Sequence, residues 1–99
     1  MYKDIITYEL ADGKEESELL KVAEEILDNW MKNLSGFVSW EINRNSENSY
    51  TDVVCWATKE DADKATAEMA NIPNATAWYA CYKEGSIKSV NLKRLVVFE

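Results

Sequence analysis

Trp56 and Asp52 are the first residues whose types and spacing could do chemistry together. A strand places alternate side chains on one face, so Asp52 shares the face of Trp56 at the end of a strand-like run. Trp78 and Tyr82 are four residues apart, which is the spacing of neighbours on one side of a helix. Tyr8 can approach from a strand near the N-terminus. A pocket with several aromatic walls and a few polar groups suits a small, planar aromatic ligand.

Each of these residues also has a purely structural interpretation. Trp56 is either one wall of a pocket or a core side chain whose indole N–H bonds to a backbone carbonyl. Asp52 is a general base if burial raises its pKa, and otherwise an exposed acid at the start of a strand. Trp78 and Tyr82 form an aromatic stripe at helical spacing, which also fits a core face. The catalytic residues therefore stay unassigned.

The other candidates for chemistry carry weaker signals. Arg44, in a predicted loop, either holds an anionic group or is solvated. Cys55 points away from Trp56 and has no histidine to activate it, so it is predicted to be a small core side chain. Asp61 and Asp63 lack further metal ligands, and acids at the start of a helix are favoured by its dipole. We expect neither a metal nor a cofactor.

The composition excludes several classes of catalytic site. The 99 residues include four Trp and five Tyr but no His. This excludes Ser-His-Asp and Cys-His nucleophiles, histidine-anchored zinc sites and haem held by a proximal histidine. The net charge of −7 argues against a nucleic-acid partner, because binding to phosphates needs clustered Lys and Arg. The length predicts a single domain over residues 1–99.

Segments that direct a chain to or across a membrane are not expected. The residues after Met1 show no basic run that leads into an apolar stretch, and no run of about 18 apolar residues occurs anywhere. Cys55 and Cys81 are single and far apart, which is typical of reduced cysteines rather than of a disulfide scaffold. We therefore expect no membrane partner and a cytoplasmic location.

Hydrophobic periodicity predicts the element order βαββαβ. Alternating apolar residues predict strands over residues 4–10, 37–43, 50–57 and 90–99. Steps of three and four residues predict helices over about 15–34, about 59–72 and about 75–82. In the second strand, the alternation places Val38, Trp40 and Ile42 on one face. Thr58 and Asp61 resemble a capping box at the start of the second helix.

This order predicts an α+β fold, the ferredoxin-like sandwich in which helices cover one face of an antiparallel sheet. The third predicted strand is apolar on both faces, with Val54 and Trp56 on one and Val53 and Cys55 on the other. An uncovered apolar face is unfavourable in water, so we expect a second copy to cover it in an isologous homodimer. An RNA-recognition module has the same element order, but residues 50–56 contain no Lys or Arg.

Two segments, LSGFVSWE at 34–41 and YTDVVCWATKEDA at 50–62, resemble the dimeric α+β barrel superfamily. Within it they are similar to the antibiotic biosynthesis monooxygenase-like proteins. The shared features are a Gly36-Phe37 step into a strand, and Trp56 followed by a short capped turn into a helix. The resemblance implies a homodimer with its sheets packed face to face, and a pocket between each sheet and its own helices.

The resemblance also implies a role for Trp56. In the family, this tryptophan lines the pocket that cofactor-independent oxygenases use for polycyclic phenols, or that haem-degrading members use. The haem-degrading members need a histidine on the second helix, which this chain lacks. Two hypotheses result: a cofactor-independent monooxygenase-like protein acting on a small aromatic substrate, or a non-catalytic homodimer that binds or senses a small molecule. An interaction or structural protein is the third alternative, since a fold does not determine a function.

Overall fold

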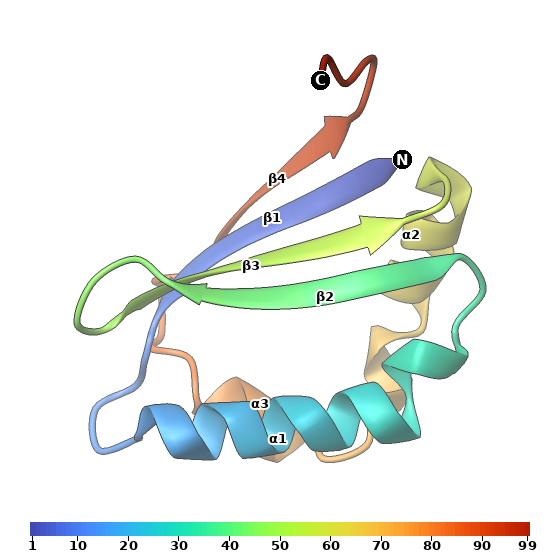
Figure 1. Cartoon of the computed structure of the whole chain (residues 1–99). Helices are drawn as coiled ribbons and strands as arrows, with labels where there is room; N and C mark the ends of the chain where they lie inside the picture. The colour runs from blue at the N-terminus through green and yellow to red at the C-terminus, as the bar shows by residue number, and fades with distance from the viewer.

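One antiparallel sheet carries the helices on a single face (Figure 1). The computed structural model describes residues 1–99. Its strands are β1 (Tyr2–Glu9), β2 (Phe37–Arg44), β3 (Ser49–Trp56) and β4 (Lys88–Lys93). Its helices are α1 (Glu16–Asn29), α2 (Lys59–Ala67) and α3 (Ala75–Ala80), with 3₁₀ turns over Met31–Asn33 and Met69–Asn71. The strand order β2-β3-β1-β4 confirms the predicted ferredoxin-like α+β fold.

The two central strands, β1 and β3, alternate between a buried and a more open face. Their buried side chains are Tyr2, Tyr8, Tyr50, Asp52, Val54 and Trp56. All six have even numbers, and the antiparallel register pairs Tyr2 with Trp56 and Tyr8 with Tyr50. One face of these strands therefore meets the helices, as the period of two predicts.

The second strand departs from its predicted alternation at a β-bulge. Two residues of β2, Phe37 and Val38, stand opposite the single residue Trp56. The Phe37 ring packs edge-on against the Trp56 ring, with 5.8 Å between the centroids. Val38 is exposed, so the prediction that it shares a face with Trp40 is wrong. The extra residue shifts the alternation by one position before Trp40.

The last strand ends at Lys93, so the predicted strand over residues 90–99 is wrong in its second half. β4 lies at the edge of the sheet, and its only neighbour is β1. The first residue of β1, Tyr2, already pairs with Lys93, and the Arg94 N–H donates to the Met1 carbonyl at 3.0 Å. The apolar residues 95–98 have no strand left to pair with, and their side chains are exposed.

The first helix is shorter than predicted. α1 buries Leu19, Ala23 and Ile26 as the spacing predicts, but it ends at Asn29 rather than near residue 34. Gly36 stands too far beyond that end to cap it. Gly36 has a φ of +75°, and a Cβ there would collide with the Asp61 side chain. The glycine thus lets the start of β2 approach the start of α2.

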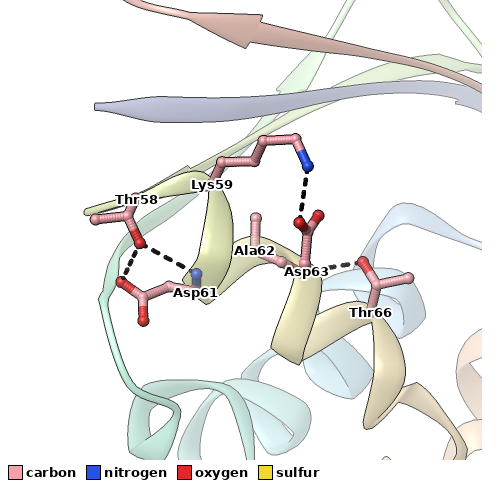
Figure 2. Close-up of polar contacts among 6 residues, drawn as sticks. All are labelled: Thr58, Lys59, Asp61, Ala62, Asp63 and Thr66. Carbon is pink, nitrogen blue, oxygen red and sulfur yellow. Dashed lines mark hydrogen bonds and ion pairs between the residues drawn. The ribbon is translucent and has the colours of Figure 1, made fainter.

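The predicted cap of the second helix is confirmed (Figure 2). The Thr58 Oγ1 accepts from the Asp61 N–H at 3.1 Å and donates to the Asp61 carboxylate at 2.9 Å. A cap of this kind contributes about 1 kcal/mol. One turn later, Lys59 Nζ lies 2.8 Å from the Asp63 carboxylate. α2 ends at Ala67, and the chain reaches the buried Ile72 through a 3₁₀ turn.

Two buried clusters form the core. The larger contains Tyr8, Leu10, Leu19, Ala23, Ile26, Tyr50, Ile72, Trp78 and Cys81. The smaller contains Tyr2, Val54, Trp56, Ala62 and Ala65. No helix of the structure has the length and apolar character that crossing a membrane requires.

Candidate functional site

A cavity of about 420 Å³ lies between the sheet and the helices, bounded by members of both core clusters. This volume lies within the range of small-molecule sites. Of the 22 residues that line it, 16 are hydrophobic. Its large aromatic side chains are Tyr2, Trp30, Trp40, Trp56, Trp78, Tyr79 and Tyr82. The cavity is therefore suited to a flat apolar molecule, and its few polar groups determine what else it can hold.

Asp52 lies on the wall of this cavity and is only 1% exposed. The interpretation of Asp52 as an exposed strand-start acid is therefore wrong. The Tyr8 hydroxyl donates to its Oδ1 at 2.9 Å, and the Trp40 indole N–H donates to its Oδ2 at 3.1 Å. Burial raises the pKa of Asp52 to about 6, although both hydrogen bonds act in the opposite direction.

Trp56 is 3% exposed and also lines the cavity. Its indole N–H donates to Asp4 Oδ2 at 3.3 Å, a carboxylate rather than the backbone carbonyl of the core interpretation. Burial raises the pKa of Asp4, the bond from Trp56 lowers it, and the negative charge of Asp63 raises it further. The cavity wall thus holds a second tryptophan–carboxylate pair.

Strand register explains why the two pairs look alike. Trp40 on β2 stands opposite Val54 and donates diagonally to Asp52, two residues away on β3. Trp56 on β3 stands opposite Tyr2 and donates diagonally to Asp4, two residues away on β1. Diagonal neighbours on one face of a sheet lie about 7–8 Å apart, which a long indole can span. The same arrangement therefore occurs twice across three adjacent strands.

The five residues that the sequence singled out lie close together. Trp56, Asp52, Trp78 and Tyr82 line the cavity, whereas Tyr8 does not line it but contacts two of its lining residues, Asp52 and Tyr82. The Tyr8 and Tyr82 ring centroids are 4.3 Å apart. Burial first, and the negative charge of Asp52 second, raise the pKa of both tyrosines, so they keep their protons at neutral pH.

The aromatic rings meet mostly edge to face. The Trp78 ring is 4.9 Å from Tyr82 at an interplanar angle of 69°, and 5.4 Å from Trp40 at 80°. Edge-to-face pairs of this kind are favourable beyond the area that they bury. The rings therefore support one another as a preformed wall, with Trp40 linking it to Asp52 through its indole N–H.

Among the cavity residues that sequence reasoning missed are Trp40, Asp4 and Asp63. Asp4 is the first residue of the predicted strand and shares strand parity with Tyr8, so the alternation already indicated that it lies on the helix-facing side. Strand alternation likewise placed Trp40 on one face of its strand, but its pairing with Asp52 depends on the register of β2 against β3. Asp63 was explained by the helix dipole alone.

Two of the weaker candidates, Arg44 and Cys55, lie outside the cavity. Arg44 Nη1 pairs with Glu16 Oε1 at 3.4 Å, and the Arg44 side chain is exposed while Glu16 is half-buried. Cys55 is half-buried and belongs to the sheet face opposite Trp56. No group of three or more acidic or thiol side chains is placed to hold a metal ion.

Comparison with known proteins gives likenesses in structure only. No protein-family model matches the chain, and no curated protein matches it. SnoaB, a cofactor-independent oxygenase from Streptomyces nogalater, has a TM-score of 0.77 and 17% identity, over 97% of this chain and 94% of SnoaB. The ActVA-Orf6 monooxygenase from Streptomyces coelicolor, in complex with nanaomycin D, has a TM-score of 0.61 and 15% identity, over 99% and 91%.

A conserved protein from Methanosarcina mazei Go1 has a TM-score of 0.71 at 7% identity, over 96% of this chain and 94% of that protein. At these identities the likeness establishes the fold and leaves the reaction open. The family resemblance in the sequence is thus confirmed for the fold, and this chain has the ferredoxin-like α+β fold of the antibiotic biosynthesis monooxygenase-like proteins.

Proposed function

We propose that this protein is a cofactor-independent, monooxygenase-like enzyme that oxidises a small aromatic substrate in the cavity between its sheet and its helices. The observation that carries the proposal is the placement of Asp52, a buried carboxylate on the wall of an aromatic cavity. With its pKa raised to about 6, Asp52 is ionised at pH 7 to 8 and is a stronger base than an exposed aspartate. The shared fold with SnoaB, described as a cofactor-independent oxygenase, supports the same reaction class.

The reaction that this base supports is the oxidation of a phenol by dioxygen. Asp52 takes the phenolic proton, which makes the ring electron-rich enough to reduce dioxygen. One oxygen atom forms a bond to the ring carbon opposite the hydroxyl, and the C–H bond there breaks. The other oxygen atom leaves as water with that hydrogen and the proton from Asp52. Dioxygen is the only oxidant, and a quinone is the organic product.

The neighbouring side chains have supporting roles in this proposal. Tyr8 and Trp40 each donate to one oxygen of Asp52 and so hold the carboxylate in place. Trp56 and Trp78 provide flat walls for the substrate ring. Tyr82 lines the cavity and keeps its proton, because burial raises its pKa, so it is a donor for an oxygen that becomes negatively charged.

The test of the enzyme proposal is oxygen consumption with a panel of naphthols and other phenols, with quinone formation followed by absorbance. Asp52→Asn is expected to lower kcat about 100-fold or more, as loss of a general base does. Activity of the unsubstituted protein is expected to fall as the pH drops through about 6, because Asp52 is then protonated. Glu47→Gln, in an exposed loop, is the control.

Two results would count against the enzyme. If the unsubstituted protein consumes oxygen no faster than the Trp56→Phe variant with every phenol of the panel, the oxygenase assignment fails. If Asp52→Asn turns over as fast as the unsubstituted protein, another group accepts the proton and the role of Asp52 is wrong.

The alternative is a non-catalytic homodimer that binds or senses a small aromatic molecule. The observation that favours it is that both oxygens of Asp52 already accept hydrogen bonds from the protein. A carboxylate held in this way can determine which ligand binds without acting as a base. Saturable quenching of tryptophan fluorescence without any oxygen consumption would favour this alternative.

The face of the sheet that lacks helices is proposed to bind a second copy of the chain. On that face Ile5 stands between Val53 and Val90 in one row across three strands, and Val90 is 60% exposed. Leu95 and Phe98, just beyond β4, are 88% and 89% exposed. An isologous contact would bury this apolar surface in both copies at once.

Light scattering at micromolar concentration tests the dimer. A mass of about twice 11.4 kDa is expected, and Val90→Asp is expected to shift it toward the single-chain mass. Leu20→Asp introduces the same charge at an exposed position on α1 and should leave the dimer intact. A single-chain mass for the unsubstituted protein would refute the dimer.

A further inference from the structure

The charged side chains that line the cavity are all negative. Its lining contains the carboxylates of Asp4, Asp52 and Asp63 but no Lys or Arg side chain. Asp63 is paired with Lys59 at 2.8 Å, as Figure 2 shows, so its charge is largely balanced. The charges of Asp4 and Asp52 remain.

Neither of these two carboxylates has a cation beside it. The ion pairs of the structure are Lys14–Glu18, Lys32–Asp28, Arg44–Glu16 and Lys59–Asp63. The partners of Asp52 are a phenol and an indole, and the partner of Asp4 is an indole; all are neutral. A buried aspartate is ordinarily paired with a positive charge. For Asp52, at 1% exposure, that charge is missing from the protein itself.

The aromatic walls of the cavity also favour a positively charged ligand. The faces of tryptophan and tyrosine rings attract cations through their quadrupole. Trp40 and Trp56 use their indole N–H groups on Asp52 and Asp4, so these two rings offer a ligand their faces rather than a donor. An anionic group in the cavity would therefore meet two carboxylates and find neither of these N–H groups free.

We propose that the cavity selects aromatic molecules that carry a protonated alkylamine and discriminates against aromatic carboxylates. This inference rests on the proposed aromatic ligand and adds its charge. The ammonium group would lie against Asp4, the diagonal neighbour of Asp52 on the sheet, and Asp52 would stay free to take the phenolic proton while the ring packs against the aromatic wall. The ligand would thereby provide the counter-ion that the protein lacks.

The experiment compares three 2-naphthols that carry a positive, a neutral or a negative substituent at the same ring position, by isothermal titration calorimetry at pH 7.5. They are 6-aminomethyl-2-naphthol, 6-methyl-2-naphthol and 6-hydroxy-2-naphthoate. The cation is expected to bind about tenfold to a hundredfold more tightly than the neutral compound, and the anion more weakly than both. Equal binding of the three would overturn the charge preference but leave an aromatic ligand in place. Binding of none of them would overturn both proposals.

Two matched variants locate the source of the preference. Asp4→Asn keeps an oxygen that can accept from the Trp56 indole but removes the charge, and it is expected to lower the cation preference about fivefold to tenfold. Glu47→Gln makes the same change in net charge in an exposed loop and should leave the preference unchanged. An equal loss in both variants would mean that the overall charge of −7, rather than the cavity, attracts the cation.

Discussion

Two tryptophan–aspartate pairs lie next to each other on the sheet, and they differ in which partner is buried. In the first pair Asp52 is 1% exposed while Trp40 is half-buried. In the second pair Trp56 is 3% exposed while Asp4 is half-buried. The bonds are similar, at 3.1 Å and 3.3 Å. Donor, acceptor and diagonal geometry are the same, so the pairs differ in which partner is buried and in the second hydrogen bond that Asp52 accepts from Tyr8.

This difference in burial indicates that the Trp56–Asp4 pair has a structural role and that the Trp40–Asp52 pair has a chemical one. Burying an indole ring is favourable, and the bond to Asp4 merely satisfies the N–H of Trp56. Burying a carboxylate is unfavourable, and the bonds from Tyr8 and Trp40 offset this only in part, since the pKa of Asp52 still rises to about 6. A fold that keeps such a group at a cavity carries a local cost that is typical of functional sites.

The largest expected effect is that of Asp52→Asn on the pH dependence of stability. The folded pKa of about 6 lies above the ordinary 3.8, so the ionised carboxylate destabilises the fold above pH 6 and this penalty is relieved as the pH falls toward 4. The amide lacks this titration but can accept from Trp40 and donate to the Tyr8 hydroxyl. The variant should therefore gain about 2 kcal/mol relative to the unsubstituted protein between pH 4 and pH 8.

Urea unfolding at pH 4, 6 and 8 measures this difference. Tyr8 and Tyr82, whose pKa values the charge of Asp52 raises, stay protonated across this range, and Asp4 titrates in both proteins. A difference between the two proteins that does not change with pH would show that Asp52 titrates as an exposed acid does. The contrast between the two pairs would then disappear.

The sequence predicted which side chains share a face, but it did not predict either tryptophan–aspartate pair across the strands. Strand parity placed Asp52 beside Trp56 and the helix spacing placed Trp78 beside Tyr82, because both patterns depend only on local geometry. The partner of Asp52 depends on the register of β2 against β3. That register is set by a bulge at Val38 and a loop over residues 45–48, which no local pattern reveals.

The same limit explains the error at the C-terminus. Residues 95–98 have the β-branched and aromatic composition of a strand. A strand also needs a neighbour, however, and β1 begins at Tyr2, which already pairs with Lys93. The end of β4 is therefore determined by the start of a distant strand rather than by its own residues.

A smaller effect is expected from Tyr8→Phe, which removes one of the two bonds to Asp52. This bond favours the ionised carboxylate, so without it the pKa of Asp52 should rise further above 6. We expect a loss of about 1.5 kcal/mol at pH 8 and a smaller loss at pH 5, where Asp52 is mostly protonated. The acidic limb of any activity profile should move to higher pH.

Tyr50→Phe is the matched control, because Tyr50 pairs with Tyr8 across the strands and donates to Glu16 instead, at 3.1 Å. It should leave the pKa of Asp52 unchanged. Carboxyl carbon chemical shifts followed by NMR give that pKa directly. If both variants change the pKa of Asp52 equally, the hydrogen bond from Tyr8 does not account for the difference between the two pairs.

The smallest effect on stability is expected from Asp4→Asn, the counterpart of Asp52→Asn in the second pair. Asp4 is half-buried and solvent screens its charge, so the unfolding free energy at pH 8 should stay within about 0.5 kcal/mol of the unsubstituted protein. The amide oxygen can still accept from Trp56. Ligand binding should respond more strongly, because Asp4 faces the cavity. A stability change as large as that of Asp52→Asn would show that the two carboxylates are equally desolvated. The greater exposure of Asp4 would then not distinguish the two pairs.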